Sequence, residues 1–77
     1  MENQRALVTF DPDDPQAGDF LLALQHKFGA DFLGSVSPGA VIVALEPGAP
    51  HRTADYIFEE SYGQGCPAQV GYPFLLR

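Results

Sequence analysis

Apolar residues recur at two different spacings in the first part of the chain. In Arg5–Phe10 they follow the two-residue period of a strand. In Pro15–Phe28 they recur every three or four positions, which predicts a helix with one apolar face. Asp14 is suited to cap the start of this helix, and Gly29 is suited to the left-handed conformation at its end. The Asp- and Pro-rich segment between strand and helix predicts a turn.

Most of the remaining chain has the composition of strands. Asp31–Ser37 and Ala40–Glu46 are separated by Pro38-Gly39, a pair that suits the middle of a type II turn. The second run is continuously apolar, as expected of a central strand that is covered on both sides. Gln69–Leu76 predicts a last strand, and Pro73 within it favours a sheet edge or a bulge.

The segment Ala54–Tyr62 is open to two interpretations. Its aromatic residues fall mainly at alternate positions, which favours a strand because aromatics pack well on a pleated surface. A helix that is capped by Thr53 and ended by Gly63 is the competing interpretation. We expect the strand.

These elements predict an α+β fold in a single domain that spans residues 1–77. One helix follows the first strand, and four extended segments follow that helix. We therefore expect one α-helix packed on a four- to five-stranded, mainly antiparallel sheet, which is a two-layer sandwich. A chain of 77 residues is too short to build a second core.

The composition adds a strong negative charge. Ten Asp and Glu residues face four Lys and Arg residues, for a formal net charge of −6. Direct binding to nucleic acid or to an anionic membrane is disfavoured, because both require clustered Lys and Arg. A basic protein surface is the favoured partner, since opposite charges speed encounter and fix orientation. The alternative is that the charge only keeps a small protein soluble.

The sequence favours a cytoplasmic protein. No apolar run reaches the roughly 20 residues that a membrane span needs, and the first residues lack the pattern of a signal peptide. Cys66 is the single cysteine, so it forms no internal disulfide and gives no sign of an oxidising compartment. A terminal strand could pair with a second copy, but Pro73 would limit such pairing. We expect a monomer or a weak dimer.

No combination of residues supports catalysis or metal binding. Cys66 with His51 or His26 lacks a third residue that would orient a thiol–imidazole pair, and the spacing does not fit a zinc site. A calcium loop that begins at Asp11 would need a glycine at its sixth position and a glutamate at its twelfth, and it has neither. We expect no enzyme activity, no metal and no cofactor.

The remaining candidates are acidic residues and tyrosines at the surface. The acids fall in two groups, one around the junction of the first strand and helix and one on Ala54–Tyr62. The candidate partner-binding residues are Asp11, Asp13, Asp14, Asp19, Asp55, Glu59 and Glu60. Tyr56, Tyr62 and Tyr72 are of a type that anchors interfaces. We nevertheless expect each tyrosine to pack in the core with its hydroxyl reaching water.

Two segments resemble a known family. Tyr62-Gly63, a polar spacer and Val70-Gly71-Tyr72-Pro73-Phe74 resemble the ending of some small anti-CRISPR proteins. Phages and mobile elements use those proteins against type I CRISPR–Cas systems. Phe28-Gly29-Ala30-Asp31-Phe32-Leu33-Gly34 is similar to a Gly-acid-Phe-x-Gly passage in the same family.

The resemblance implies one helix on an antiparallel sheet and inhibition of the multisubunit Cascade complex. Cascade holds a basic channel for guide and target strands, so an acidic protein can act as a DNA mimic on its phosphate-binding Lys and Arg residues. Such an inhibitor would block target DNA binding or nuclease recruitment without chemistry. An antitoxin-like or regulatory protein that masks another basic partner is the alternative.

Overall fold

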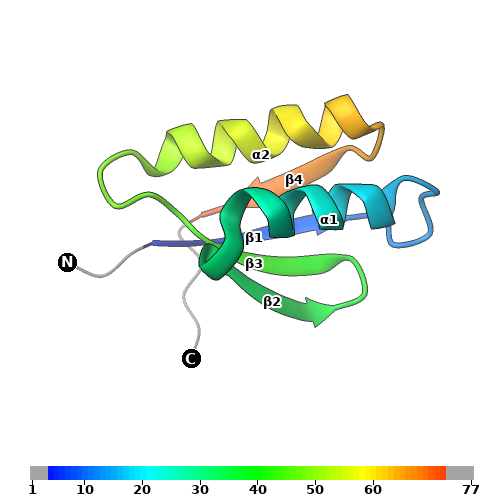
Figure 1. Ribbon diagram of the computed structural model, residues 1–77, viewed down its shortest axis with the longest axis horizontal. Coiled ribbons are helices and arrows are strands. Elements are labelled where there is room, and N and C mark those ends of the chain that lie inside the picture. Colours follow the sequence, from blue (N-terminus) through cyan, green and yellow to red (C-terminus); the bar gives the residue numbers. More distant parts are fainter. Residues whose placement is uncertain (1–3, 73–77) are drawn as a thin grey trace.

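The apolar runs of the sequence pair into one four-stranded antiparallel sheet, with two α-helices packed on the same face (Figure 1). The computed structural model describes residues 4–72. Its elements are β1 (Arg5–Phe10), α1 (Ala17–Phe28), a 3₁₀ turn (Gly29–Asp31), β2 (Phe32–Ser37), β3 (Ala40–Ala44), α2 (Pro50–Gln64) and β4 (Ala68–Gly71).

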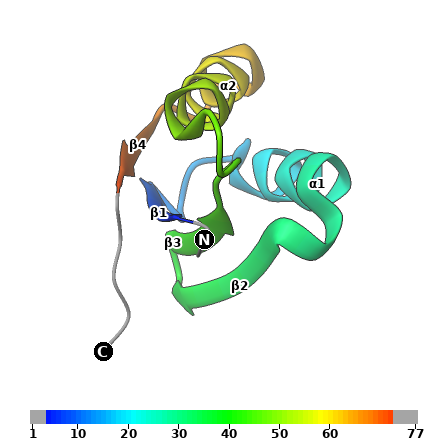
Figure 2. The ribbon, with the colours of Figure 1, turned by 90° about the vertical axis from the view of Figure 1, so that its left-hand side faces the viewer.

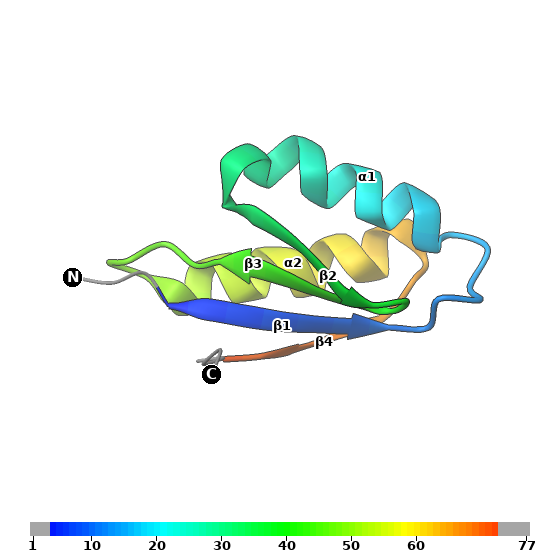
Figure 3. The same cartoon turned by 90° about the horizontal axis from the view of Figure 1, so that it is seen from below.

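The strands lie in the order β2-β3-β1-β4, and each neighbouring pair is antiparallel. Each helix therefore connects two parallel strands that have one other strand between them. This βαββαβ order is the split-βαβ, or ferredoxin-like, arrangement. An end-on view places α1 and α2 in one layer and the sheet in the other (Figure 2). The view from below shows the strands in front of α2 (Figure 3). The predicted α+β two-layer sandwich is confirmed.

The core lies between the sheet and the two helices. Val8 and Val43 project from the central strands, and Phe20, Leu24 and Ile57 meet them from the helices; all five are buried. Antiparallel partners that lie directly opposite share one face, so the pairing of Ala6 with Val43 places both on this side. Every residue of β3 is buried, as its continuous apolar run predicts.

The predicted strand Ala54–Tyr62 is wrong, because this segment belongs to α2. Ala54, Ile57 and Ser61 are the buried residues of the helix, and their spacing of three and four positions is the helical period. The sheet offers an apolar surface to this stripe, which outweighs the strand preference of the aromatics. The fold therefore has two helices where we expected one.

The ends of α2 also differ from the competing helical interpretation. Pro50 lies in its first turn, where the missing N–H costs nothing, so the helix begins before Thr53. The Thr53 hydroxyl instead accepts a hydrogen bond from the Glu46 amide at 3.3 Å. Gly65, with a left-handed φ of 77°, ends the helix in place of Gly63.

The other predicted boundaries hold with small shifts. The first strand is confirmed, and α1 begins two residues after the predicted Pro15 because the preceding segment forms turns. The second strand begins at Phe32, after the 3₁₀ turn, and the third ends at Ala44. The last strand begins at Ala68; residues 73–76 of its predicted range, with Pro73, lie outside the described residues.

The β2–β3 turn touches the loop that follows β1. Gly39 has a φ of 118°, and its carbonyl accepts a hydrogen bond from the Phe10 amide at 2.9 Å. A β-carbon at Gly39 would lie 2.6 Å from the Phe10 carbonyl oxygen and 2.9 Å from Cδ of Pro12. Only glycine fits this contact, which holds the β1–α1 loop against the end of the sheet. Neither described helix is long and apolar enough to cross a membrane.

Candidate functional site

The acidic residues of the β1–α1 loop build the turns that shape it. The Asp13 amide donates to Oδ1 of Asp11 at 2.9 Å, and the Gln16 amide donates to Oδ1 of Asp14 at 2.8 Å. The Asp14 amide also donates to the Asp11 carbonyl at 3.2 Å. These are the local side-chain bonds that make Asp a turn residue. The loop therefore presents its carboxylates from a defined backbone, and Asp11 and Asp13 are exposed.

Several connections gather around this loop at one end of the molecule. The β2–β3 turn reaches it through Gly39 and Pro12, and the α2–β4 turn reaches it on the other side. A β-carbon on Gly65 would lie 3.7 Å from Cγ of Gln16. We call this region, with its residues Asp11, Asp13, Asp14 and Asp19, the acidic end.

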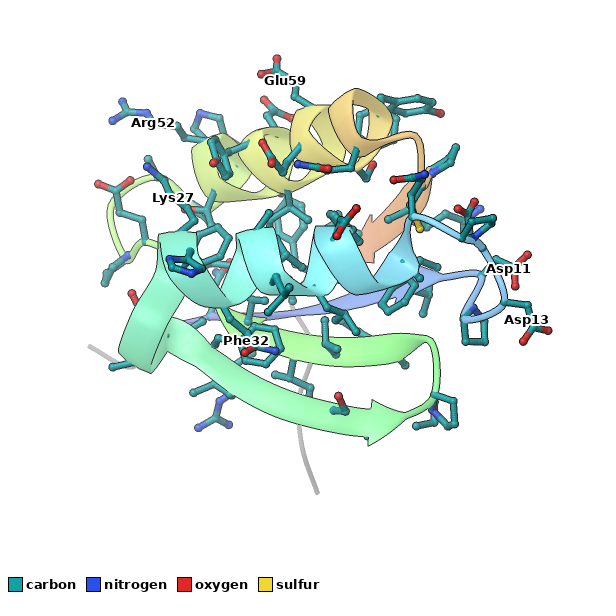
Figure 4. All side chains as sticks on the ribbon, turned by 45° about the vertical axis from the view of Figure 1, so that its right-hand side comes forward. Asp11, Asp13, Lys27, Phe32, Arg52 and Glu59 are labelled. Atoms are coloured by element: carbon teal, nitrogen blue, oxygen red, sulfur yellow. The ribbon has the colours of Figure 1, made fainter. Side chains whose placement is uncertain are left out.

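The described Lys and Arg residues lie away from the acidic end. Arg5 begins β1, Lys27 is in the last turn of α1, and Arg52 is in the first turn of α2. The Gln4 carbonyl accepts a hydrogen bond from the Leu45 amide at 2.7 Å, so the start of β1 and the end of β3 lie together. Figure 4 shows Lys27 and Arg52 on the opposite side of the molecule from Asp11 and Asp13. The acidic end therefore gathers four carboxylates with no described Lys or Arg among them, while Asp31 and Glu46 lie with the three described bases at the opposite end.

The acids of α2 do not form one group. Asp55 and Glu59 are exposed and four residues apart, so they share one face of the helix. Glu60 is half-buried, and its Oε1 accepts a hydrogen bond from Nε2 of Gln64 at 3.1 Å. Burial, and next the Glu60 carboxylate, raise the pKa of Tyr56. The Glu60 side chain is therefore engaged by its neighbours on α2. Asp55 and Glu59 are the α2 acids that a partner can reach.

Two aromatic rings stand beside the reachable acids of α2. Phe58 and Tyr62 are 45% and 58% exposed, and their rings meet edge to face with centroids 4.8 Å apart. We call Asp55, Phe58, Glu59 and Tyr62 the α2 ridge. Phe58 is not among the residues expected from the sequence. Its four-residue spacing from Tyr62 is a helical signal, and the strand interpretation of this segment gives that spacing no meaning.

The expected burial of the tyrosines is correct for one of the three. Tyr56 is half-buried between the helices, where its ring meets that of Phe28 at 5.9 Å and lies 4.9 Å from Nζ of Lys27. Tyr62 and Tyr72 are exposed, at 58% and 41%, so the expectation of core packing is wrong for them. Tyr62 is on the outer side of α2, because the inner side is taken by Ala54, Ile57 and Ser61.

Cys66 is buried in the core, close enough to the acidic end to be affected by two of its carboxylates. Its burial, followed by the charges of Asp14 and Asp11, raises the pKa of the thiol, which disfavours the nucleophilic thiolate. His26 and His51 are exposed at the far ends of their helices from Cys66. Among residues 4–72, no three His, Cys, Asp or Glu side chains come together as metal ligands.

The outward face of the sheet lacks the residues that ferredoxin-like RNA-binding domains use. Those domains stack bases on aromatic side chains of their central strands. On β1 and β3 the outward positions, opposite one another in the pairing, hold Arg5, Leu7, Thr9, Ala40, Ile42 and Ala44. None of these is aromatic, and Phe10 instead packs edge to face on Phe20 in the core at 5.6 Å. The described sheet thus offers no base-stacking platform.

Comparison with known proteins adds no relative. No family model matches the chain, and neither a search of curated proteins nor a search of solved structures finds a match. Because the ferredoxin-like arrangement carries many unrelated functions, the fold alone does not indicate one. The functional argument rests on the acidic end and the α2 ridge.

Proposed function

We propose that this protein is a non-enzymatic inhibitor that binds a basic surface of the type I Cascade complex and blocks target DNA binding or nuclease recruitment. The observation that carries the proposal is a cluster of carboxylates at one end that contains no described Lys or Arg. The acidic end gathers carboxylates on one loop and helix start, and Arg5, Lys27 and Arg52 lie elsewhere. A field of one sign at one end orients the protein toward a basic partner.

The mechanism is competition for phosphate-binding residues. Nucleic acid is held mainly by Lys and Arg that neutralise phosphates, and a row of carboxylates can occupy the same cations. The hydrogen bonds of Asp11 and Asp14 fix the loop before binding, which lowers the entropy lost when it docks. Asp13 and Asp19 are exposed and lie on either side of the helix start.

The resemblance to anti-CRISPR proteins supplies the name of the target. Phe28–Gly34 spans the exit from α1 into β2, and Val70 and Gly71 lie in β4. Tyr62-Gly63 lies in the last turn of α2. These matching positions build the fold, so the choice of Cascade rests on the resemblance and the choice of surface rests on charge. An antitoxin-like or regulatory protein with another basic partner would use the same acidic end.

A phage-plaquing assay in strains that each carry one type I system tests the proposal. Expression of the protein should restore plaques in at least one strain, and the variant Asp13→Lys/Asp19→Lys should lose that effect. The matched control is Asp31→Lys/Glu46→Lys, which makes the same change of charge at exposed residues away from the acidic end. Absence of protection in every strain would exclude Cascade as the target, and capture of a toxin or transcription factor from host lysate would favour the alternative.

A further inference from the structure

The α2 ridge leaves two large aromatic side chains in solvent. Phe58 and Tyr62 are 45% and 58% exposed, although α2 has a complete buried face in Ala54, Ile57 and Ser61. The rings contact each other at 4.8 Å, which holds them as one apolar surface. An exposed aromatic pair adds little to folding, and Tyr and Phe are enriched where proteins bind one another.

The charges beside the rings select the chemistry of the partner. Asp55 and Glu59 are exposed on the same side of the helix as Tyr62. A phosphate or an anionic lipid would meet these carboxylates first and be repelled. A cation that also stacks on aromatic rings fits both features, and a guanidinium does so because it is planar and can bind a carboxylate with two hydrogen bonds.

The same helix already holds a cation against an aromatic ring on its other side. Nζ of Lys27, on α1, lies 4.9 Å from the centre of the Tyr56 ring on α2, and Glu60 follows Tyr56 by one helical turn. This pairing of a cation with an aromatic ring occurs within the fold, between α1 and α2. The α2 ridge places two further rings beside carboxylates in solvent, and the described residues place no cation over those rings.

A second copy of the chain is a poor occupant of the ridge. If two α2 helices met antiparallel across their ridges, Asp55 of each copy would face Glu59 of the other. Such like-charged pairs destabilise an interface, and each chain carries a net charge of −6. A basic segment of a different protein meets no such penalty.

We propose that the α2 ridge binds an arginine-bearing segment of the protein partner, with guanidinium groups stacked on Phe58 and Tyr62 and paired with Asp55 and Glu59. This inference rests on the proposed function. In it the α2 ridge recognises arginine, and the acidic end attracts any basic surface. The ridge ends near the acidic end, because Tyr62 lies three residues before Gly65, where an added β-carbon would lie 3.7 Å from Cγ of Gln16 in the β1–α1 loop.

Titration of the ¹⁵N-labelled protein with a hexa-arginine peptide, and separately with a hexa-lysine peptide, tests the assignment. Hexa-arginine should bind about two- to fivefold more tightly, because a guanidinium can stack on a ring and bind a carboxylate with two hydrogen bonds whereas an ammonium cannot, and it should shift the backbone amide signals of residues 55–62. The variant Phe58→Ala/Tyr62→Ala should lose this preference for arginine. Leu22→Ala, which removes an exposed apolar side chain of α1, is the matched control and should keep the preference for arginine.

The outcomes separate this inference from the proposed function. Equal affinity for both peptides, or amide shifts confined to residues 11–19, would overturn the α2 ridge and leave the acidic end in place. An arginine preference that survives in Phe58→Ala/Tyr62→Ala would overturn it too. An arginine preference that depends on the two rings would support the ridge even if no type I strain were protected. A thermal melt of each variant verifies that it folds. We expect Phe58→Ala/Tyr62→Ala to stay folded, because both rings are exposed.

Discussion

The buried hydroxyl of Ser61 accepts a hydrogen bond from the backbone amide of Ala68 at 3.2 Å, which ties the end of α2 to the start of β4. The same hydroxyl donates to the Phe58 carbonyl at 2.7 Å. Ser61 is 0% exposed, so water cannot replace it as a partner for the Ala68 amide. This contact joins the end of α2, which carries the ridge on its outer side, to the sheet.

We predict that Ser61→Ala destabilises the protein by about 1–3 kcal/mol, the usual cost of leaving a buried amide without an acceptor. Urea unfolding followed by circular dichroism measures the change in the free energy of unfolding. Ser35→Ala, at an exposed position of β2, is the control and should change stability much less. Equal effects of the two substitutions would contradict the role of the Ser61 hydroxyl.

Gly39→Ala should destabilise the protein by about 1–3 kcal/mol through backbone strain and the close approach to Phe10 and Pro12. Gly48→Ala is the control, because a β-carbon there has no neighbour within 4 Å. The comparison of the two midpoints of thermal unfolding measures the effect. Equal midpoints of thermal unfolding for the two variants would contradict the contact by which the β2–β3 turn holds the β1–α1 loop.

Gly18→Ala should stabilise the protein by about 0.5–1 kcal/mol, because Gly18 lies inside α1 and alanine is the better helix former. A β-carbon at Gly18 has open space around it. The free energy of unfolding in urea gives the test. A loss of stability would mean that the start of α1 does not have the described helical conformation.

The first strand and α1 could be predicted because each has one clear period. Segment 54–62 could not, since its buried stripe uses the weak apolar signals of Ala54 and Ser61 while its aromatics fall mainly at alternate positions. The burial of that stripe depends on the sheet below it, which the local sequence does not reveal. Likewise, the turn-forming role of the Asp-rich loop follows from composition, but its separation from Lys27 and Arg52 follows from the topology.

Stability should fall at alkaline pH. Burial raises the pKa of the Tyr56 hydroxyl above its ordinary value of 10.0, and Glu60 adds to the rise. Burial likewise raises the pKa of the Cys66 thiol above its ordinary value of 9.0, with added effects of Asp14 and Asp11. The contribution of each group to the free energy of unfolding is fully present below its ordinary pKa. This contribution is lost as pH rises through the pKa of the folded state, because the group ionises first in the unfolded chain. Urea midpoints measured across this range should decline.

Glu60→Gln isolates one cause of that decline. Removal of the carboxylate should lower the pKa of Tyr56, while its burial keeps part of the shift. Ultraviolet titration of tyrosinate formation in a Tyr62→Phe/Tyr72→Phe background measures this change, and Glu59→Gln, at an exposed neighbour, is the control. A Tyr56 titration that is the same in both variants would contradict the effect of Glu60.

The central claim is that the acidic end binds a basic surface of Cascade. The most direct measurement is the affinity of the purified protein for a purified type I Cascade complex, determined at several salt concentrations. We predict that Asp13→Lys/Asp19→Lys weakens binding at least about tenfold and reduces its dependence on salt, as expected when charge pairs are lost. The control Asp31→Lys/Glu46→Lys should bind nearly as the unchanged protein does. Equal affinity of all three proteins, or no binding at low salt by the unchanged protein to any type I complex, would contradict the claim.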